Sequence, residues 1–416
     1  MSTIRIEDLA DPALDDGQRG ALAYAAGLDI TFDVDALLAE ARTRTGLTDF
    51  GPDDFVVRLH AMVDAIESDT GLGPLGRLIL RQRTVRLLAN RLLVEDQVRR
   101  HPEILDIELA EPIIVIGLPR SGTTHLVNLI AADPRLRALP YWESLEPLAG
   151  PGADTRYERC AQNYAAATAM APLVVAMHDQ YPDAIEEEIE LQDIDFASYT
   201  LEWHARVPRW RDFYFGLDQR PHYAYLKKVL QVCTHERGPS RWVLKSPQHL
   251  EQIGALVSTF SDATFAVTHR DPVSVIQSAI TMAAYGDRMR RPRIEPEALA
   301  AYWVDRIERL LRACVRDRDL LPADRTVDVI FDAFMADDVG LVERIYERAR
   351  LPMTGTARAA LDAYMAANPR GKHGRVVYDL QGDFGLDPAT VRERFGFYFD
   401  RFPVPVESGA DRRPGP

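Results

Sequence analysis

The sequence contains, at residues 111–132, the stretch EPIIVIGLPRSGTTHLVNLIAA. Its apolar part at 111–118 is rich in Ile and Val, is flanked by Pro112 and Pro119, and is too short for a helix of its own. These features predict a buried parallel strand. Apolar residues then recur at helical spacing from His125 onward. The stretch therefore predicts a strand, a glycine-containing turn and a helix in immediate succession.

Similar units return later in the chain. The segments 241–245, 263–269 and 325–331 read as short strands, and each precedes a helical pattern. Strands that alternate with helices of this length predict an α/β fold, a P-loop-like parallel sheet flanked by helices on both faces. The first two strands are separated by the mostly helical residues 121–240. We expect the insertion at about 150–240 to cap the carboxyl edge of the sheet, where such proteins bind ligands.

The remaining chain divides around this unit. Residues 1–105 predict an N-terminal helical region, 106–405 an α/β domain that includes the insertion, and 406–416 a disordered tail. A segment in the first region, 75–100, is rich in arginine, and 186–195 is rich in Glu and Asp. Runs of this kind usually form solvated helix faces, which is the interpretation we expect here. An anion site on the first run and an acidic wall beside an acceptor on the second are the alternatives.

Composition excludes several classes of protein. The 416 residues include 49 Lys and Arg against 63 Asp and Glu, a formal net charge of −14. This acidity disfavours nucleic acid and anionic membranes as partners. No stretch approaches the roughly 20 apolar residues that span a bilayer, and the acidic start lacks the features of a signal peptide. The three cysteines are isolated, so they predict no zinc site and a reducing, cytoplasmic location.

The turn after the first strand has the features of a phosphate-binding loop. Gly117 and Gly122 have the spacing of a P-loop, and successive backbone N–H groups at such a turn converge on an anion at the helix N-terminus. However, Thr123 stands where a nucleotide triphosphatase has its lysine, and the cation, Arg120, lies inside the loop. The loop therefore lacks the lysine on which binding and reaction of ATP depend in a P-loop.

The loop PRSGTT resembles the 5′-phosphosulfate-binding loop of sulfotransferases that use 3′-phosphoadenosine-5′-phosphosulfate (PAPS). The resemblance implies that Arg120, Ser121, Gly122, Thr123 and Thr124 bind the 5′-phosphosulfate. Sulfotransferases also have an Arg that is followed eight residues later by a Ser, both of which contact the 3′-phosphate. Arg270 and Ser278 have this spacing, and Arg270 directly follows a predicted strand.

Two further stretches resemble the branch that contains tyrosylprotein sulfotransferases and many bacterial enzymes. Leu244-Lys245-Ser246-Pro247 is similar to an element that places the lysine near the transferred sulfuryl group. Glu143 lies where that branch has its carboxylate base, although two extra residues precede it. The alternatives are a structural Glu143 paired with a nearby arginine, and His249 as the base. Pro247 occupies the position at which cytosolic sulfotransferases would place that histidine.

The resemblance implies three more cofactor contacts. Phe331, at the end of the fourth predicted strand, is placed where relatives have an aromatic ring against adenine; a core phenylalanine is the alternative. Arg370 and Lys372 belong to a basic, glycine-containing segment that is similar to the one closing over the 3′-phosphate. Its residue order differs from the usual Arg-Lys-Gly, so whether the segment closes on the cofactor stays open.

Together the motifs predict an enzyme that moves a sulfuryl group from PAPS to a hydroxyl of a small or lipid-like acceptor, without a metal. The aromatic residues of 199–215 favour an apolar acceptor, or they belong to the core. A P-loop small-molecule kinase and a catalytically inactive nucleotide-binding scaffold are the other candidates. The acceptor and the oligomeric state, for which a homodimer is one option, are left open by the sequence.

Overall fold

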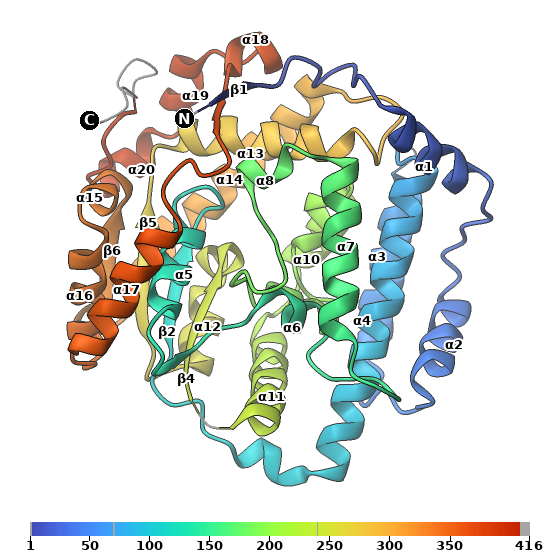
Figure 1. Ribbon diagram of the computed structural model, residues 1–416, viewed down its shortest axis with the longest axis horizontal. Coiled ribbons are helices and arrows are strands. Elements are labelled where there is room, and N and C mark those ends of the chain that lie inside the picture. The colour runs from blue at the N-terminus through green and yellow to red at the C-terminus, as the bar shows by residue number, and fades with distance from the viewer. Residues whose placement is uncertain (1, 70, 239, 408–416) are drawn as a thin grey trace.

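The chain was studied as a computed structural model that describes residues 2–69, 71–238 and 240–407. From residue 408 onward the predicted tail lies outside the described residues. The main sheet has the order β3-β4-β2-β5-β6, and every neighbouring pair is parallel (Figure 1). Its strands are β2 (Ile113–Gly117), β3 (Leu136–Arg137), β4 (Arg241–Ser246), β5 (Thr264–His269) and β6 (Thr326–Ile330). The predicted α/β fold with a parallel sheet is confirmed.

Four of these strands lie where the sequence predicts them. The edge strand β3 was not predicted, because two residues carry no readable periodicity. A second, two-stranded parallel sheet joins β1 (Thr3–Arg5) to β7 (Arg375–Val377), so the beginning of the chain is paired with a segment close to its end.

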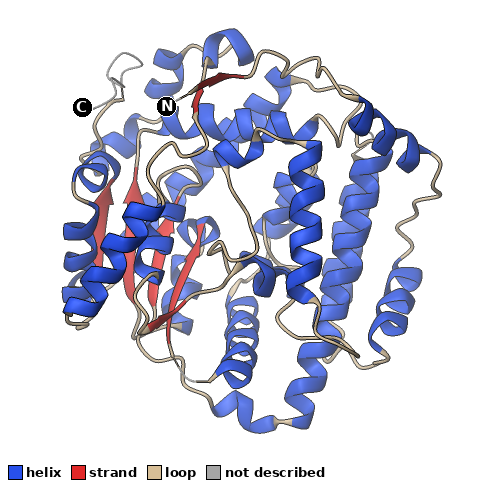
Figure 2. Cartoon of the chain, viewed as in Figure 1, coloured by secondary structure: helices blue, strands red, loops and turns tan. Residues whose placement is uncertain are grey.

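Helices make up most of the remaining structure (Figure 2). The α-helices are α1 (Asp16–Ala26), α2 (Val34–Thr45), α3 (Phe55–Ser68), α4 (Pro74–Arg100), α5 (Thr123–Ala131), α6 (Tyr141–Leu145), α7 (Arg156–Met170), α8 (Val174–Met177), α9 (Ile189–Gln192), α10 (Pro208–Phe215), α11 (Arg220–Arg237), α12 (Ile253–Thr259), α13 (Pro272–Asp287), α14 (Pro296–Asp317), α15 (Phe331–Ala336), α16 (Asp338–Arg348), α17 (Gly355–Ala367), α18 (Leu380–Phe384), α19 (Pro388–Arg394) and α20 (Gly396–Arg401). The 3-10 helices are η1 (Pro102–Asp106), η2 (Asp193–Asp195), η3 (Thr200–Trp203), η4 (Pro247–Glu251), η5 (Arg318–Leu320) and η6 (Ala323–Arg325).

The sheet separates two apolar cores. In β2, Ile114 and Ile116 belong to the large core, while Ile113 and Val115 belong to the smaller one. Successive side chains of a strand point to opposite faces, which produces this division. Helices α5, α16 and α17 contribute to the smaller core, and α4, α11, α13 and α14 to the larger one. β2 is thus buried on both faces, as its continuous apolar sequence predicts.

The two charged runs pair with each other, so the prediction that both form solvated faces is wrong. On α4, Arg83 binds Glu190 and Asp193 at 2.8 and 2.5 Å, and Arg91 binds Asp195 at 2.7 Å. Arg91, Asp193 and Asp195 are buried. Charges buried in a core need partners of opposite sign. The N-terminal helical region and the insertion therefore meet through ion pairs that no single segment reveals.

Three further findings concern the chain as a whole. Within the described ranges, the helices are all too short or too polar to cross a membrane. Cys160, Cys233 and Cys314 are buried free thiols. The large core contains residues of the N-terminal helices together with residues of β2, β4 and β5. The predicted boundary at about residue 105 stays a prediction.

Candidate active site

The turn between β2 and α5 has the geometry that the predicted anion site at a helix N-terminus requires. Gly122 has φ 89° and Arg120 has φ 68°, values in the left-handed region. A non-glycine residue in this region is strained, and such strain is concentrated at functional turns. α5 begins at Thr123 without a side-chain cap. Its first N–H groups therefore offer donors to a ligand.

Gly117 lets the turn approach the neighbouring strand. A Cβ on this residue would lie 1.8 Å from Oγ1 of Thr268 on β5. Thr268 in turn lies 2.7 Å from the Ser121 hydroxyl, which also donates to the Leu118 carbonyl at 2.6 Å. The Ser121 side chain thus shapes the loop internally, and its predicted contact with a ligand would come from its backbone.

The structure brings Arg120, Arg270 and Ser278 together. Arg120 Nε donates to the Ser278 hydroxyl at 3.0 Å, and Arg270 Nη1 donates to the Arg120 carbonyl at 2.7 Å. Ser278, on α13, donates in turn to the Tyr378 hydroxyl at 2.9 Å. Burial lowers the pKa of Arg120. An arginine stays charged in proteins, so two cations lie side by side beside the loop.

Phe331 lies at the same place. Its ring is 3.9 Å from the Arg270 guanidinium carbon, and a Cβ on Gly122 would come within 3.2 Å of the ring. Phe331 is half-buried, so its ring borders the phosphate loop. Arg270 also binds Glu407, with Nε–Oε1 and Nη2–Oε2 distances of 2.7 and 3.0 Å.

Lys245 reaches the loop from β4. Its side chain is fully buried, with Nζ 3.4 Å from Thr124 Oγ1 and 2.6 Å from Glu187 Oε1. The β2–β4 register sets Lys245 opposite Val115. The cation therefore lies at the carboxyl end of the sheet, directly beside the loop between β2 and α5. Its place at the transferred group stays a prediction.

The segment 177–187 covers this end of the sheet. The Met177 carbonyl accepts a hydrogen bond from Arg120, and His178 Nε2 lies 3.2 Å from Glu186 Oε1. Burial, with Lys245 and Arg120 nearby, lowers the pKa of His178 to about 4. Burial raises the pKa of both Glu186 and Glu187. A neutral imidazole and two carboxyl groups thus surround the Lys245 ammonium.

Glu143 is buried on α6 and bound by arginines on both sides. Its Oε1 accepts from Arg137 at 2.9 Å and its Oε2 from Arg237 at 3.0 Å. Arg137 lies on β3 opposite Trp242, three residues before Lys245 along β4. Burial raises the pKa of Glu143. These contacts match the structural alternative, and the catalytic role of Glu143 stays a prediction.

His249 is fully buried in η4, with both ring nitrogens engaged. Nε2 lies 2.6 Å from Glu188 Oε1, and Nδ1 lies 2.8 Å from the Tyr223 hydroxyl. Glu188 Oε2 also accepts from the Lys245 backbone N–H at 2.7 Å. The histidine therefore supports the end of β4 through Glu188, and its role as the base also stays a prediction.

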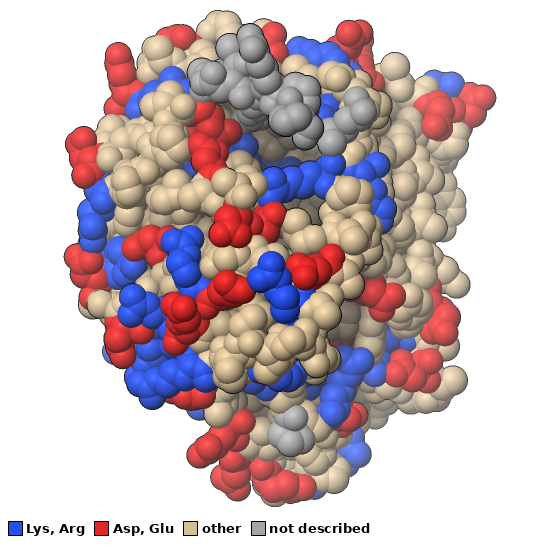
Figure 3. Space-filling view, turned by 60° about the vertical axis from the view of Figure 1, so that its left-hand side comes forward, with Lys and Arg blue, Asp and Glu red and all other residues tan. Residues whose placement is uncertain are grey.

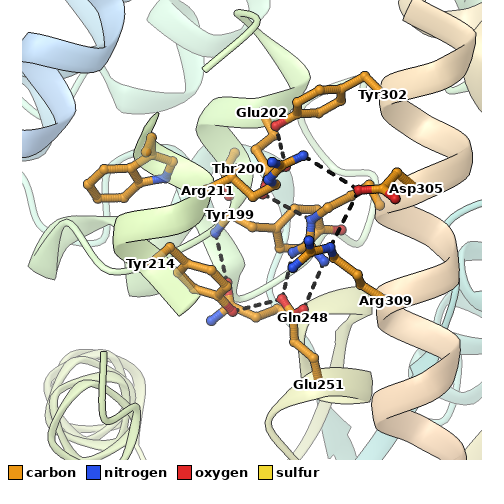
Figure 4. A network of polar contacts seen from close by, with 12 residues as sticks. Tyr199, Thr200, Glu202, Arg211, Tyr214, Gln248, Glu251, Tyr302, Asp305 and Arg309 are labelled. Carbon is orange, nitrogen blue, oxygen red and sulfur yellow. Dashed lines mark hydrogen bonds and ion pairs between the residues drawn. The ribbon is translucent and has the colours of Figure 1, made fainter. Parts of the chain in front are cut away.

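A buried network holds η4 against α14. Glu251 accepts from the Tyr214 hydroxyl at 2.9 Å, and Tyr302 donates to Glu202 at 2.6 Å (Figure 4). Arg306 lies between the two carboxylates, with an Nε–Oε1 distance of 3.0 Å to Glu202 and an Nη2–Oε1 distance of 2.6 Å to Glu251. This network fixes the segment that follows Lys245.

Arg370 and Lys372 lie in an exposed turn at the edge of the site. Arg370 donates to the Met335 carbonyl at 2.7 Å and pairs with Asp338 at 2.6 Å. Asp338 also lies 3.2 Å from Nε2 of His125, on α5. Lys372 is exposed.

On the face drawn in Figure 3, basic and acidic side chains are interspersed, and basic side chains border a hollow. The predicted closure over a phosphate stays a prediction.

Sequence reasoning missed Glu187, His178 and Glu407 as neighbours of the predicted cations. The first belongs to a run that we expected to be solvated, and the third lies more than 130 residues from Arg270 along the chain. No spacing signal links them to the loop. For Glu187 the sequence offered one indication, the alternative that its acidic run forms a wall beside an acceptor.

Comparison with known proteins identifies a family for this chain. The model of the sulfotransferase family matches residues 112–355. The omega-hydroxy-beta-dihydromenaquinone-9 sulfotransferase Stf3 of Mycobacterium tuberculosis is 24% identical over 306 residues, covering 70% of this chain and 74% of Stf3.

Two crystal structures also superpose closely. Sulfotransferase STF1 from Mycobacterium tuberculosis has a TM-score of 0.78 and 29% identity, covering 89% of this chain and 99% of STF1. Sulfotransferase STF9 from Mycobacterium avium has a TM-score of 0.81 and 25% identity, covering 91% of this chain and 99% of STF9. Because the family model spans more than half of the sequence, the chain belongs to the sulfotransferase family.

Proposed function

We propose that this sulfotransferase moves a sulfuryl group from PAPS to the hydroxyl of a small or lipid-like, apolar acceptor. One observation carries the proposal. Arg120, Lys245 and Arg270 converge on an uncapped helix N-terminus where β2, β4 and β5 end. A helix N-terminus and arginine guanidinium groups both favour phosphate and sulfate groups. These residues fit PAPS, a compact polyanion.

The position of each residue would decide which part of PAPS it contacts. The Thr123 and Thr124 N–H groups would hold the 5′-phosphate, and Arg270 with Ser278 the 3′-phosphate. Arg120 and Lys245 would neutralise charge that grows on the sulfonate and leaving-group oxygens. Transfer of this kind depends on positioning and charge stabilisation, as phosphoryl transfer does.

The acceptor class is proposed from the name of a relative. Stf3 is named for a hydroxylated menaquinone, which favours a lipid-like acceptor by analogy. The aromatic residues of the insertion add little, because Tyr199, Trp210 and Tyr214 are buried core residues. We place the reaction in the cytoplasm, a reducing compartment that suits three free, buried cysteines.

The nucleotide specificity is the direct test of this function. The product nucleotide, adenosine 3′,5′-bisphosphate (PAP), should raise the melting temperature without magnesium, since three protein cations replace the metal. ATP should stabilise the chain less, with or without magnesium, because Thr123 stands where a kinase has its P-loop lysine. Differential scanning fluorimetry at equal ligand concentrations measures both.

The outcomes separate the candidate functions. Stabilisation by ATP with magnesium alone would contradict the sulfotransferase proposal and favour a kinase. Stabilisation by PAP without transfer of labelled sulfate from PAPS to water, dodecanol or 2-naphthol would indicate the inactive scaffold. Transfer to any of these hydroxyl compounds supports the proposal.

A further inference from the structure

Among the carboxylates around the phosphate loop, Glu187 stands apart in its contacts. Both carboxylate oxygens of Glu143 accept hydrogen bonds from arginines, and those of Glu188 bind the Lys245 N–H and His249. Among the described residues, the Glu187 carboxylate accepts a hydrogen bond at one oxygen only, from Lys245 Nζ at 2.6 Å. Its side chain is 20% exposed, whereas that of Lys245 is fully buried. The Glu187 carboxylate is therefore the one that solvent, or an acceptor, reaches beside Lys245.

The position of Glu187 suits a proton acceptor. Lys245 Nζ bridges Glu187 and Thr124 of the phosphate loop, with distances of 2.6 and 3.4 Å. If Lys245 contacts the transferred group, as we propose, an attacking hydroxyl must pass within a few ångströms of this carboxylate. A general base has to lie within hydrogen-bond reach of the proton that it removes.

We propose that Glu187 is the general base of the transfer, an inference that rests on the function proposed above. As the acceptor oxygen forms its bond to sulfur, the acceptor O–H bond breaks and its proton moves to the Glu187 carboxylate. The bond between sulfur and the phosphate oxygen breaks, and its electron pair leaves with PAP. Lys245 faces both the base and the departing oxygen, so it balances charge on each side.

The groups that face Glu187 define the pH dependence. They are Lys245 from β4, Glu186 and His178 from the covering segment, and Tyr199. Burial is the largest influence and raises the pKa of Glu187; Glu186 acts in the same direction, and Lys245 opposes both. The base must be ionised to act. Turnover should therefore fall as the pH drops through this raised pKa.

Exchange of the carboxylate for an amide tests the assignment. Glu187→Gln should lower the rate of sulfate transfer from labelled PAPS, to water and to dodecanol, by about 10²–10⁴-fold. It should also abolish the fall in rate at acid pH. PAP affinity should stay equal or increase, because Lys245 loses an ionic partner. Glu187→Asp, which keeps a carboxylate, should retain the acid limb.

Three outcomes would overturn the assignment. The first is unchanged transfer by Glu187→Gln. The second is an acid limb that persists in Glu187→Gln. The third is loss of that limb in Glu143→Gln or His178→Gln with Glu187→Gln unaffected. If the wild-type protein binds PAP yet transfers to none of water, dodecanol and 2-naphthol, the proposed function falls, and this inference with it.

A separate observation concerns the other end of the cofactor site. Glu407 binds Arg270 with two parallel hydrogen bonds of 2.7 and 3.0 Å, and both side chains are mostly buried. The Glu407 N–H donates to Asp271 Oδ2 at 2.9 Å, which holds the segment in place. A carboxylate and a phosphate use the same two-pronged face of a guanidinium group. Glu407 thus occupies the face of Arg270 that a 3′-phosphate would need.

We infer that Glu407 competes with the 3′-phosphate for Arg270 and weakens nucleotide binding, which again presumes the proposed role of Arg270. A ligand that must displace an internal partner binds with an affinity reduced by the fraction of open sites. Removal of the Glu407 charge should therefore tighten PAP binding by about tenfold, if the pair is closed in about nine molecules of ten.

Calorimetry with two nucleotides tests the competition. Glu407→Gln should bind PAP more tightly than the wild type, and 5′-AMP, which lacks the 3′-phosphate, equally well. Arg270→Ala should bind PAP weakly, and adding Glu407→Gln to it should change nothing further. Equal PAP affinity of Glu407→Gln and wild type, or an equal gain for 5′-AMP, would overturn the inference. Failure of Arg270→Ala to weaken PAP binding would instead contradict the proposed role of Arg270.

Discussion

Lys245→Met should lower the rate of sulfate transfer by about 10²–10³-fold, the loss typical of removing one donor that stabilises developing charge. Methionine keeps the length of the buried side chain but removes the ammonium beside Thr124 and Glu187. Without this cation, Glu187 becomes harder to ionise, so the acid limb of the pH–rate profile should move to higher pH. Steady-state assays with labelled PAPS between about pH 5 and 9 measure both effects.

Lys228→Met is the matched control for this substitution. Lys228 also forms an ion pair, with Glu95 at 2.7 Å, but it lies on α11 away from the phosphate loop. Its replacement should leave the rate and the pH profile unchanged. A Lys245→Met protein with wild-type turnover would remove Lys245 from the reaction. A loss shared by both variants would point to folding rather than chemistry.

Arg306→Met should lower the free energy of unfolding by about 3–5 kcal/mol at neutral pH, the cost of leaving buried charge without its partner. Arg306 and Glu202 have side chains that are fully buried, and Glu251 is nearly so. The substitution leaves two carboxylates facing each other in the core. Urea denaturation at pH 7.5 measures the loss.

The loss should become smaller at low pH. Burial already raises the pKa of Glu202 above its ordinary value. A group with a raised pKa in the folded state favours folding more as the pH falls, because the folded protein then binds the proton more readily than the unfolded chain. Removal of Arg306 should raise that pKa further, so the variant should recover stability at pH 5 relative to pH 7.5.

Arg312→Met is the control on the same helix. Arg312 pairs with Glu308 one turn away, and its side chain is 57% exposed. Exposed pairs of this kind contribute at most about 0.5 kcal/mol. An Arg306→Met protein as stable as Arg312→Met would show that the buried network does not hold α14 to η4.

Local sequence was sufficient for the elements that carry their own signal. The continuous Ile and Val run of β2 and the helical spacing after it need no tertiary partner to be read. The turn between them is also readable from the sequence, because Gly122 permits the left-handed backbone conformation that precedes α5. Strand β3 could not be predicted, because its two residues form a strand only through their pairing with β4.

Charged segments show the opposite behaviour. The acidic run 186–195 is predicted to be solvated, because nothing within it indicates that the arginines of α4 pair with it. The same ambiguity affects Glu143, whose two arginine partners come from β3 and α11. Whether a charged side chain is buried or solvated depends on its partners, and partners far along the chain leave no local sequence pattern.

The sequence by itself indicated the strands, the helices that follow them and the turn after β2, because each has a pattern within about ten residues. Only the tertiary structure decided which groups surround the predicted cations. Glu187 and Glu407 reach Lys245 and Arg270 from 58 and 137 residues away. Parallel strands end at one edge of the sheet, so the fold gathers there residues that the chain keeps far apart.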